Sequence, residues 1–308
     1  MRHLADLEQL VSQKPPGRIA VAAAHEENVL RSVHAVYSKG YASPILIGDK
    51  EKIFSCADAL ELDVSKMGII KETDAVRCAE IAVNLVQSAE ADAIMKGQLQ
   101  TADLLKAVLS RDKGLRTGGL LSHIGLYDVA GYNKLLLVTD AGINIDPNLQ
   151  QKVDIIRNAV KVAGALGIQL PKVAVLAAIE TVNPAMPSTL DAAALAKMAD
   201  RGQIKDCLVD GPLAMDNAIN LEAAKQKNII SPVAGDADIL LVPDIEAGNI
   251  LVKALTFISK ARSCGTITGA RVPLIVTSRA ESSEAKYFSI LLALTMLGHN
   301  DPEIGRES

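Results

Sequence analysis

The chain has 308 residues, of which 49% are hydrophobic and 22% charged, as is usual for a globular protein with a sizeable core. Aromatic residues make up only 3% and Trp is absent, which argues against stacking platforms for single-stranded nucleic acid. The formal net charge of −4 provides no general attraction to nucleic acid or to an anionic membrane. An anionic ligand must therefore be bound by a local site. The length suggests two domains or one large one.

The cysteines and the beginning of the chain bear on its location. None of the cysteines is paired at metal-ligand spacing, which indicates small buried side chains in a reducing compartment. They are Cys56, Cys78, Cys207 and Cys264. Residues 1–14 have the pattern of an amphipathic helix rather than of a signal peptide. Because no apolar run approaches the ~20 residues that span a bilayer, we expect a cytoplasmic protein.

Apolar runs and helical patterns alternate along the first third of the chain. Short apolar runs predict strands at 18–23, 44–47, 68–70 and 93–95. Amphipathic patterns predict the helices that follow them, at 26–39, 50–60, 74–87 and 102–109. This alternation predicts a parallel sheet with right-handed crossovers and helices on its faces.

The alternation breaks after residue 110 and then resumes. Runs at 120–127 and 135–138 flank a short loop with Gly131, which predicts an antiparallel hairpin in a mixed sheet. Further strands are expected at 173–177, 207–209, 239–242 and 272–276. Further helices are expected at 148–166, 189–199, 245–260 and 284–297. Since there is no long linker, the pattern suggests two lobes that share a cleft.

Polar residues follow several of the predicted strands. These strand ends are Lys96-Gly97, Thr139-Asp140, Asp210-Gly211-Pro212, Pro243-Asp244 and Thr277-Ser278-Arg279. Ligands of open α/β sheets bind outside the carboxyl ends of the strands. After the last strand, Ser282 or Ser283 is expected to cap a helix with acidic residues near its positive end. An ordinary strand-to-helix turn with a solvated Arg is an equally good reading of this segment alone.

Three cations could form an anion site with hydroxyl groups and helix N-termini. Lys96, Arg116 and Arg279 lie at predicted strand ends or domain edges, where they could hold phosphate groups. His123 lies in the hairpin beside the Arg116 loop. An acidic set could bind a divalent metal, although helix caps and turns explain most of its members. The set is Asp210, Asp216, Asp236, Asp238 and Asp244.

A series of motifs occurs in one order along nearly the whole chain. They are Met95-Lys96-Gly97, Gly114-Leu115-Arg116-Thr117-Gly118, Asn183-Pro184-Ala185-Met186-Pro187-Ser188-Thr189, Asp210-Gly211-Pro212-Leu213-Ala214-Met215-Asp216, Gly235-Asp236-Ala237-Asp238, Pro243-Asp244-Ile245-Glu246-Ala247-Gly248-Asn249 and Thr277-Ser278-Arg279-Ala280. Together they resemble the phosphate acetyl/butyryltransferase family, most closely its phosphate butyryltransferase branch.

This resemblance implies a fold and a reaction. The implied fold has two α/β domains with mostly parallel sheets flanked by helices, in an isocitrate dehydrogenase-like architecture with an interdomain cleft. The expected domains are residues 1–134 with 279–308, and residues 135–278. The implied reaction transfers an acyl group, butyryl or a similar short chain, between coenzyme A and phosphate. Both are substrates, no cofactor or metal is bound, and a homodimer or higher homo-oligomer is expected.

The resemblance also implies roles for individual residues. Arg279 would stabilise the oxyanion and Ser278 would hydrogen-bond it, in a direct transfer without an acyl-enzyme. The acetyl branch has an Asp as base seven positions after the serine, where this chain has Ala285. The butyryl branch tends to have an Asp three positions after it, where this chain has Glu281. Glu281 is therefore the first choice as base and Glu284 the second.

Coenzyme A and phosphate are expected to bind a further set of residues: Lys96, Gly97, Arg116, Thr117, His123, Asp210, Asp244 and Asn249. Two other functions stay open. The acidic set is compatible with a metal- and NAD(P)-dependent dehydrogenase on the same architecture. Ala285 is compatible with a catalytically silent relative that binds coenzyme A without turnover.

Overall fold

The computed structural model describes residues 1–278 and 280–298. The chain divides into two compact units. The terminal unit consists of Ala5–Gly119 and Cys264–Ser308, and the middle unit of Met1–Leu4 and Leu120–Ser263. Both boundaries come 15 residues earlier than those expected from the sequence, at 119 instead of 134 and at 263 instead of 278. The expected boundary at 134 falls inside the hairpin, and the structure keeps both hairpin strands in one unit.

The sheet of the terminal unit has the strand order β3-β2-β1-β4-β11-β10. Its strands are β1 (Gly17–Ala22), β2 (Ala42–Gly48), β3 (Gly68–Lys71), β4 (Ala93–Lys96), β10 (Arg262–Thr268) and β11 (Leu274–Ile275). Strands β1 to β4 and β11 are parallel, and β10 is antiparallel to β11. The expected parallel sheet is therefore confirmed in this unit.

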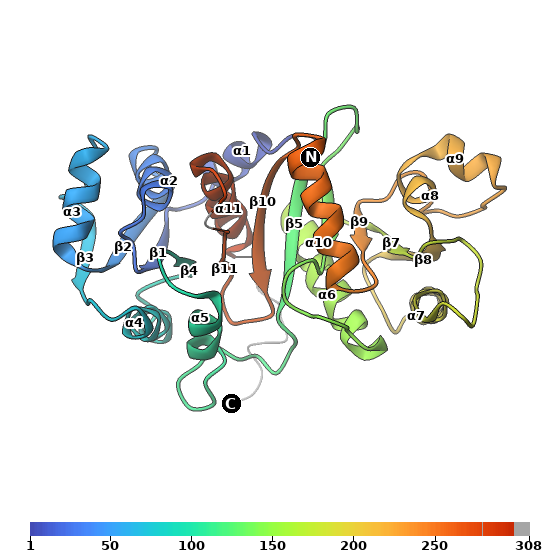
Figure 1. Cartoon of the computed structure of the whole chain (residues 1–308), viewed down its shortest axis with the longest axis horizontal. Helices are drawn as coiled ribbons and strands as arrows, with labels where there is room; N and C mark the ends of the chain where they lie inside the picture. Colours follow the sequence, from blue (N-terminus) through green and yellow to red (C-terminus); the bar gives the residue numbers. More distant parts are fainter. Residues whose placement is uncertain (279, 299–308) are drawn as a thin grey trace. The chain divides into compact units, whose positions relative to one another are not determined.

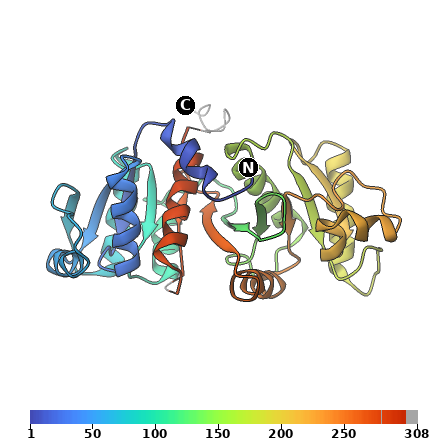
Figure 2. The same ribbon diagram turned by 90° about the horizontal axis from the view of Figure 1, so that it is seen from above.

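Helices cover both faces of this sheet. They are α1 (Asp6–Ser12), α2 (Glu27–Ser38), α3 (Lys50–Ala59), α4 (Ala75–Gln87), α5 (Thr101–Val108) and α11 (Ser283–Met296). The chain moves outward from β1 to β3 and returns across β1 to β4, so right-handed crossovers place α2 and α4 on opposite faces. Helices α2 and α11 pack side by side on one face, and α4 packs on α5 (Figures 1 and 2).

The middle unit has the strand order β5-β6-β9-β7-β8. Its strands are β5 (Ser122–Asp128), β6 (Leu136–Thr139), β7 (Lys172–Leu176), β8 (Leu208–Leu213) and β9 (Ile239–Leu241). Its helices are α6 (Leu149–Ala165), α7 (Pro187–Asp200), α8 (Met215–Ile219), α9 (Leu221–Gln226) and α10 (Ile245–Lys253), which continues into a π-helical turn, η1 (Ala254–Ile258). Strands β5 and β6 form the expected antiparallel hairpin, and the other strands are parallel.

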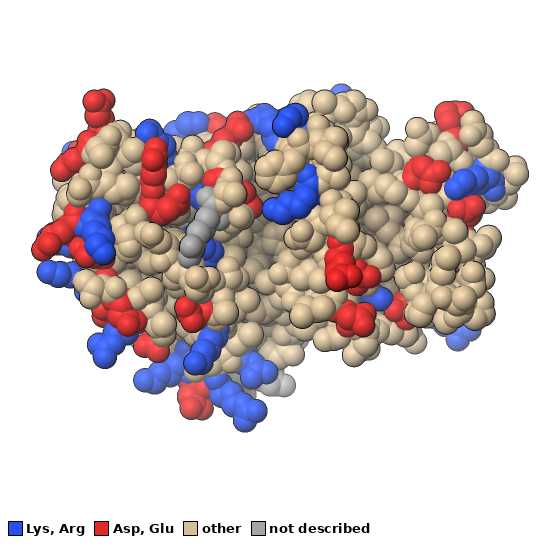
Figure 3. All heavy atoms as spheres, viewed as in Figure 1, with Lys and Arg blue, Asp and Glu red and all other residues tan. Residues whose placement is uncertain are grey.

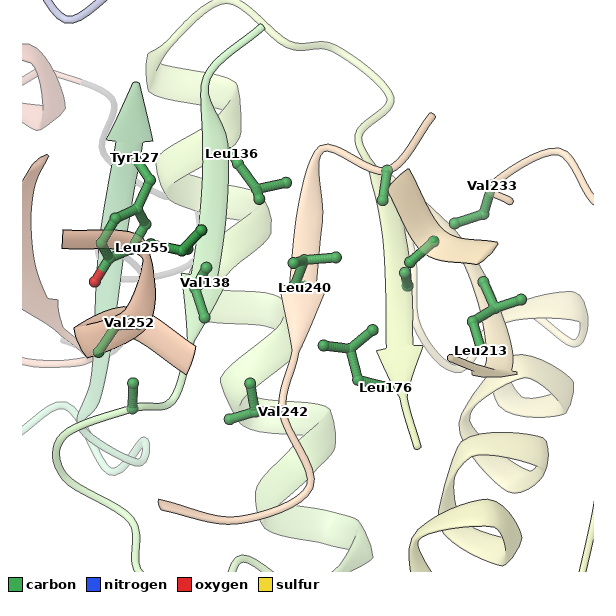
Figure 4. Packing of buried hydrophobic residues seen from close by; sticks show 14 of the residues in the cluster. Tyr127, Leu136, Val138, Leu176, Leu213, Val233, Leu240, Val242, Val252 and Leu255 are labelled. Atoms are coloured by element: carbon green, nitrogen blue, oxygen red, sulfur yellow. The ribbon is translucent and has the colours of Figure 1, made fainter. Parts of the chain in front are cut away.

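The core of the middle unit is aliphatic, as the composition predicts. Leu240 of β9 and Val138 of β6 lie in one buried cluster with Val252 and Leu255 of α10 and η1 (Figure 4). Burying such side chains supplies roughly 1.5–3 kcal/mol each, relative to leaving them exposed. The central strands β6 and β9 are thereby fixed, and with them the loops that follow.

The structure corrects two strands. The strand expected at 207–209 ends too early, because β8 continues through Asp210 to Leu213. It includes Pro212, which is tolerated because β8 lies at the edge of this sheet, where one side of a strand needs no N–H donor. Strand β10 was not expected, because its alternating Ser, Gly and Thr residues do not form an apolar run.

No helix within the described residues combines the length and the apolar character needed to cross a membrane.

Candidate active site

The terminal unit has its topological switch point between β1 and β4, where the direction of strand succession reverses. Such a point opens a crevice at the carboxyl ends of the strands, where α/β proteins bind ligands. Strand β11 lies on the other side of β4, with Ile275 beside Met95. We call the residues that follow Ala22, Lys96 and Ile275 at these strand ends the carboxyl edge of the terminal unit.

Gly97 brings the loops after β1 and β4 into close contact. Its N–H donates to the carbonyl oxygen of Ala22 at 2.8 Å, and the next residue, Gln98, donates to that of Ala23 at 2.8 Å. A Cβ atom at Gly97 would lie 2.7 Å from the Ala22 oxygen and would overlap the Ala23 oxygen even more. Only glycine permits this approach.

Lys96 is almost fully buried, with 5% of its surface exposed. Its Nζ donates to the carbonyl oxygens of Gly97 and Leu99, each at 3.2 Å. The ammonium group therefore fixes the loop that leads to α5. The first turn of α5 has no side-chain cap from its N-cap residue, Gln100, so its N–H groups point toward this loop without that acceptor.

Strand β11 ends in a short turn that carries the motif serine. Ser278 is exposed, and its Oγ accepts a hydrogen bond from the N–H of Ala280 at 3.3 Å. Its carbonyl oxygen accepts the N–H of Glu281 at 3.1 Å, which closes the turn. Arg279 falls between them and lies outside the described residues.

The helix after this turn decides how the two candidate bases are placed. Ser282 caps α11 by accepting the N–H of Ala285 at 3.2 Å, so the expected serine cap is confirmed. Glu281 is half-buried in the turn, whereas Glu284 is exposed in the first turn of α11. Ala285 is buried at 9% exposure and continues the apolar inner face of the helix. Of the two acids, Glu281 is the one that closes the turn at Ser278.

Lys286 was not among the site residues predicted from the sequence, but the structure places it at the same edge. Lys286 is 2% exposed, and its Nζ donates to Thr277 Oγ1 at 3.0 Å and to the Ser278 carbonyl oxygen at 2.9 Å. Burial lowers the pKa of this lysine, and Glu26 and Glu281 partly oppose that shift. The signal in the sequence was a lysine within a largely apolar helical pattern at 284–297.

Arg116 and Thr117 lie at the opposite edge of the same sheet. Arg116 forms an antiparallel bridge with Ala270, and Thr117 Oγ1 donates to the carbonyl oxygen of Gly269 at 2.7 Å. Gly269 and Ala270 lead into the amino end of β11, so the two residues are at the amino edge. Lys96 and Arg116, which were both expected to hold phosphate groups, therefore lie at opposite edges of this sheet. The reason is that α5 carries the chain back to the amino edge before this loop begins.

In the middle unit, the loop after β6 is organised by a buried carboxylate. Asp140 is 2% exposed and accepts the N–H groups of Gly142 at 2.9 Å, Ile143 at 3.0 Å and Asn144 at 3.3 Å. The side-chain amide of Asn144 adds a fourth hydrogen bond at 2.6 Å. Asp140 is therefore a structural acceptor that shapes this loop.

His123, Asp244 and Asn249 lie near this loop, at the carboxyl edge of the middle unit. Thr139 donates to the His123 carbonyl oxygen at 2.9 Å, and a Cβ at Gly142 would lie 3.4 Å from the imidazole. Asp244 caps α10 by accepting the N–H of Ala247 at 2.8 Å. Asn249 is exposed on the same helix.

The structure separates the acidic set that could have bound a metal. Asp210 lies within the edge strand β8, where its Oδ1 accepts the N–H of Gly211 at 2.8 Å. Asp236 and Asp238 precede β9 at the amino edge, and Lys134 pairs with them at 2.8 and 2.6 Å. Lys172 pairs with Asp236 at 2.6 Å as well. Over residues 1–278 and 280–298, no group of three or more His, Cys, Asp or Glu side chains could hold a metal ion.

The chain matches a family model described as phosphate acetyl/butaryl transferase, over residues 5–82 and 74–294. It is 45% identical over 289 residues to the phosphate butyryltransferase of Clostridium acetobutylicum, which covers 94% of this chain and 96% of that protein. It is 45% identical over 276 residues to the phosphate acetyltransferase of Thermotoga maritima, covering 90% of this chain and 94% of that one.

Solved structures include close and distant neighbours of the fold. A branched-chain phosphotransacylase from Enterococcus faecalis superposes with a TM-score of 0.81 at 33% identity, covering 92% of this chain and 99% of that one. A 4-hydroxythreonine-4-phosphate dehydrogenase from Klebsiella pneumoniae superposes with a TM-score of 0.55 at 15% identity, covering 91% and 99%. At that identity the second likeness concerns the fold alone.

Proposed function

Since the chain belongs to the phosphate acetyl/butyryl transferase family, we propose that it transfers a short-chain acyl group, butyryl or similar, between coenzyme A and inorganic phosphate. It is a phosphate acyltransferase. The observation that carries this proposal is the 45% identity to a phosphate butyryltransferase over 94% of the chain. The dehydrogenase reading retains only a distant likeness of fold, at 15% identity.

The reaction is a direct transfer between two substrates in one complex. A phosphate oxygen attacks the thioester carbonyl carbon and forms a C–O bond, while the C–S bond breaks and coenzyme A leaves as a thiolate that takes up a proton. Negative charge develops on the carbonyl oxygen and needs a fixed donor. The exposed hydroxyl of Ser278 can supply one, since its Oγ accepts the N–H of Ala280 and can at the same time donate its own proton to a substrate. Arg279 has the same role by family resemblance.

Phosphate is expected to bind at the carboxyl edge of the terminal unit. The N–H groups in the first turn of α5 attract anions, and Lys96 and Gly97 shape the loop that precedes them. In the reverse reaction the coenzyme A thiol must lose a proton to a base. Glu281 is the proposed base, because its turn is closed on Ser278; Glu284 is the alternative.

Coenzyme A is much longer than phosphate, and its nucleotide end carries several negative charges. Arg116 and Thr117 are therefore proposed to contact that end rather than the reacting carbonyl. His123, Asp244 and Asn249 are proposed to contribute further contacts from the middle unit. Asp210, which lies within the edge strand β8, is proposed as a substrate contact as well. No resident cofactor is proposed.

The protein is further proposed to be a cytoplasmic homodimer. All four cysteines are free, as is usual in a reducing compartment. Helical spacing places three exposed apolar residues of α10 and η1 on one face: Ile250, Phe257 and Ile258, which are 71%, 57% and 80% exposed. Such a face marks an interaction surface, and a two-fold dimer would cover it with its own copy. Because the formal net charge is −4 and the side seen in Figure 3 carries both basic and acidic side chains, no nucleic acid or membrane partner is proposed.

Light scattering after size-exclusion chromatography tests the dimer. Phe257→Glu should convert the dimer to a monomer. Leu170→Glu serves as the control, because Leu170 is 54% exposed in the same unit but outside this face. A dimer that persists in Phe257→Glu, or a monomeric wild type, would contradict the arrangement.

The reaction itself is tested by thiol release from butyryl-CoA with and without phosphate. We expect release only with phosphate, and a series from acetyl- to hexanoyl-CoA should give the highest kcat/KM near butyryl. Release without phosphate, or coenzyme A binding with no turnover on any member of the series, would exclude the transfer. A chelator-sensitive absorbance change with NAD(P) and a hydroxy acid would instead favour the dehydrogenase.

A further inference from the structure

Lys286 is among the largest fully buried side chains of the described chain, and it is the one charged group among the buried residues of α11. Burying an ammonium group is unfavourable, and an apolar residue at such a position is often at least as stable. In the terminal unit the partners of its Nζ are the hydroxyl of Thr277 and the carbonyl oxygen of Ser278. A buried charge that contacts these two neighbours points to a role at that strand end.

The two acceptors belong to the segment that follows β11 and leads into the motif turn. Thr277 is 4% exposed, so its hydroxyl faces the interior. The Ser278 carbonyl oxygen accepts both Lys286 Nζ at 2.9 Å and the Glu281 N–H at 3.1 Å. From α2, Asn28 Nδ2 contacts the Glu281 carbonyl oxygen at 3.4 Å. The ammonium group therefore joins α11 to the two consecutive residues, Thr277 and Ser278, that lead into the turn.

A second buried lysine provides a contrast. Lys152 of α6 is 5% exposed, and its Nζ lies 2.6 Å from Asp191 Oδ2 of α7. This is an ion pair between two helices, and none of the candidate site residues takes part in it. Lys286 has two neutral oxygens at the same distance range, both in the motif segment. Burial is common to both lysines, but only Lys286 acts on the carboxyl edge.

We propose that Lys286 is a positioning residue for the acyl transfer, whose ammonium group fixes the end of β11 so that the Ser278 hydroxyl faces the developing oxyanion. The inference rests on the proposed function. Lys286 does not touch the substrates. It acts through Thr277 and the Ser278 backbone, so its loss should slow the chemical step and leave substrate binding nearly unchanged.

The test compares Lys286→Met with Lys152→Met in the full chain, each with thermal unfolding measured beside the kinetics. Lys286→Met should lower kcat by about 30-fold and change KM for butyryl-CoA and phosphate by less than about twofold. Lys152→Met should lower the melting temperature without lowering kcat. A folded Lys286→Met protein with wild-type kcat, or a loss carried by KM, would overturn the inference.

A milder pair of variants covers the case in which Lys286→Met does not fold. Thr277→Val removes the hydroxyl that Lys286 contacts, and Thr277→Ser keeps it. Thr277→Val should lower kcat by about threefold relative to Thr277→Ser, and adding it to Lys286→Met should cause no further loss. Equal kcat values for the two Thr277 variants would contradict the proposal. If wild type releases no coenzyme A with phosphate, the proposed function fails first; if wild type is active and these variants are too, only the role of Lys286 fails.

Discussion

The two edges of the sheets carry the same kinds of residue but use them differently. At the carboxyl edge of the terminal unit, Lys96 and Lys286 donate to backbone oxygens and hold loops in place. At the amino edge of the middle unit, Lys134 and Lys172 pair with Asp236 and Asp238. The first arrangement shapes a loop that carries Ser278, and the second neutralises charge where three strands begin. The role of a lysine near a strand can therefore be inferred only when it is known at which edge of the sheet the lysine lies.

At the carboxyl edge, a substitution of Ser278 should lower activity without lowering stability. Ser278→Ala removes an exposed hydroxyl, so the melting temperature should not change. Because the hydroxyl is a proposed donor to the oxyanion, kcat should fall by about 10²–10³-fold. The measurement is phosphate-dependent coenzyme A release, with unfolding followed by circular dichroism. Wild-type kcat in Ser278→Ala would show that this edge does not carry the chemistry.

A pair of glycines, one at each edge, sharpens the comparison through stability. Gly97→Ala places a methyl group against two backbone oxygens, which should cost roughly 1–3 kcal/mol of unfolding free energy and reduce activity. Gly119→Ala is the matched control, since the nearest atom to its Cβ would be Thr117 Oγ1 at 3.5 Å. Chemical denaturation measures both. Similar unfolding free energies for the two variants would mean that the contact at Gly97 relaxes easily.

At the amino edge of the terminal unit, the charge of Arg116 should affect only the binding of coenzyme A. Arg116→Ala should raise KM for butyryl-CoA by about tenfold, the effect of losing one hydrogen bond to a charged group. KM for phosphate and kcat should stay the same, because Arg116 lies at the other end of β11 from Ser278. Steady-state kinetics with each substrate varied in turn separates these terms. An equal rise in KM for phosphate would instead show that Arg116 takes part in binding inorganic phosphate.

The smallest effect is expected from pH at the amino edge of the middle unit. Partial burial opposes ionisation of Asp236, but hydrogen bonds from Lys134 and Lys172 outweigh it and lower the pKa of this carboxyl below 3.8. Its contribution to stability is therefore complete above about pH 4 and is lost as the pH falls through the lowered value. Asp236→Asn should be less stable than wild type at pH 6, and the difference should shrink toward pH 3. Melting temperatures across this range check it, and a constant difference would contradict the ion pairing.

Much of the fold follows from local patterns in the sequence. The alternation of apolar runs and helices predicts most strands to within two residues, because each buried strand of a parallel sheet is a continuous apolar segment. Strand β10 was not predicted, because Gly265 and the Thr residues near it do not form such an apolar segment. The order of strands was not predictable from these patterns, since nothing local places β11 beside β4 or β9 between β6 and β7.

The site residues that directly follow strands could be predicted from the sequence. The residues that reach the site through tertiary packing could not. Lys96, Gly97 and Ser278 follow strands, and the structure brings them to one edge. Arg116 follows a helix, and the alternation alone implies that such a loop returns to the opposite edge. Lys286 is unusual as a lysine in a largely apolar helical pattern, but only the structure shows that its ammonium group reaches the Ser278 carbonyl oxygen.

Strand β11 forms its ladder with only two residues, Leu274 and Ile275, yet it inserts between β4 and β10. During synthesis, β1 and β4 emerge long before β11. The strand that leads to Ser278 can therefore pair with β4 only when nearly all of the chain has been made. Pairings between segments so distant in sequence are slow to form. The site should therefore be completed last. A chain that ends before residue 274 should have an unpaired edge on β4 and no activity.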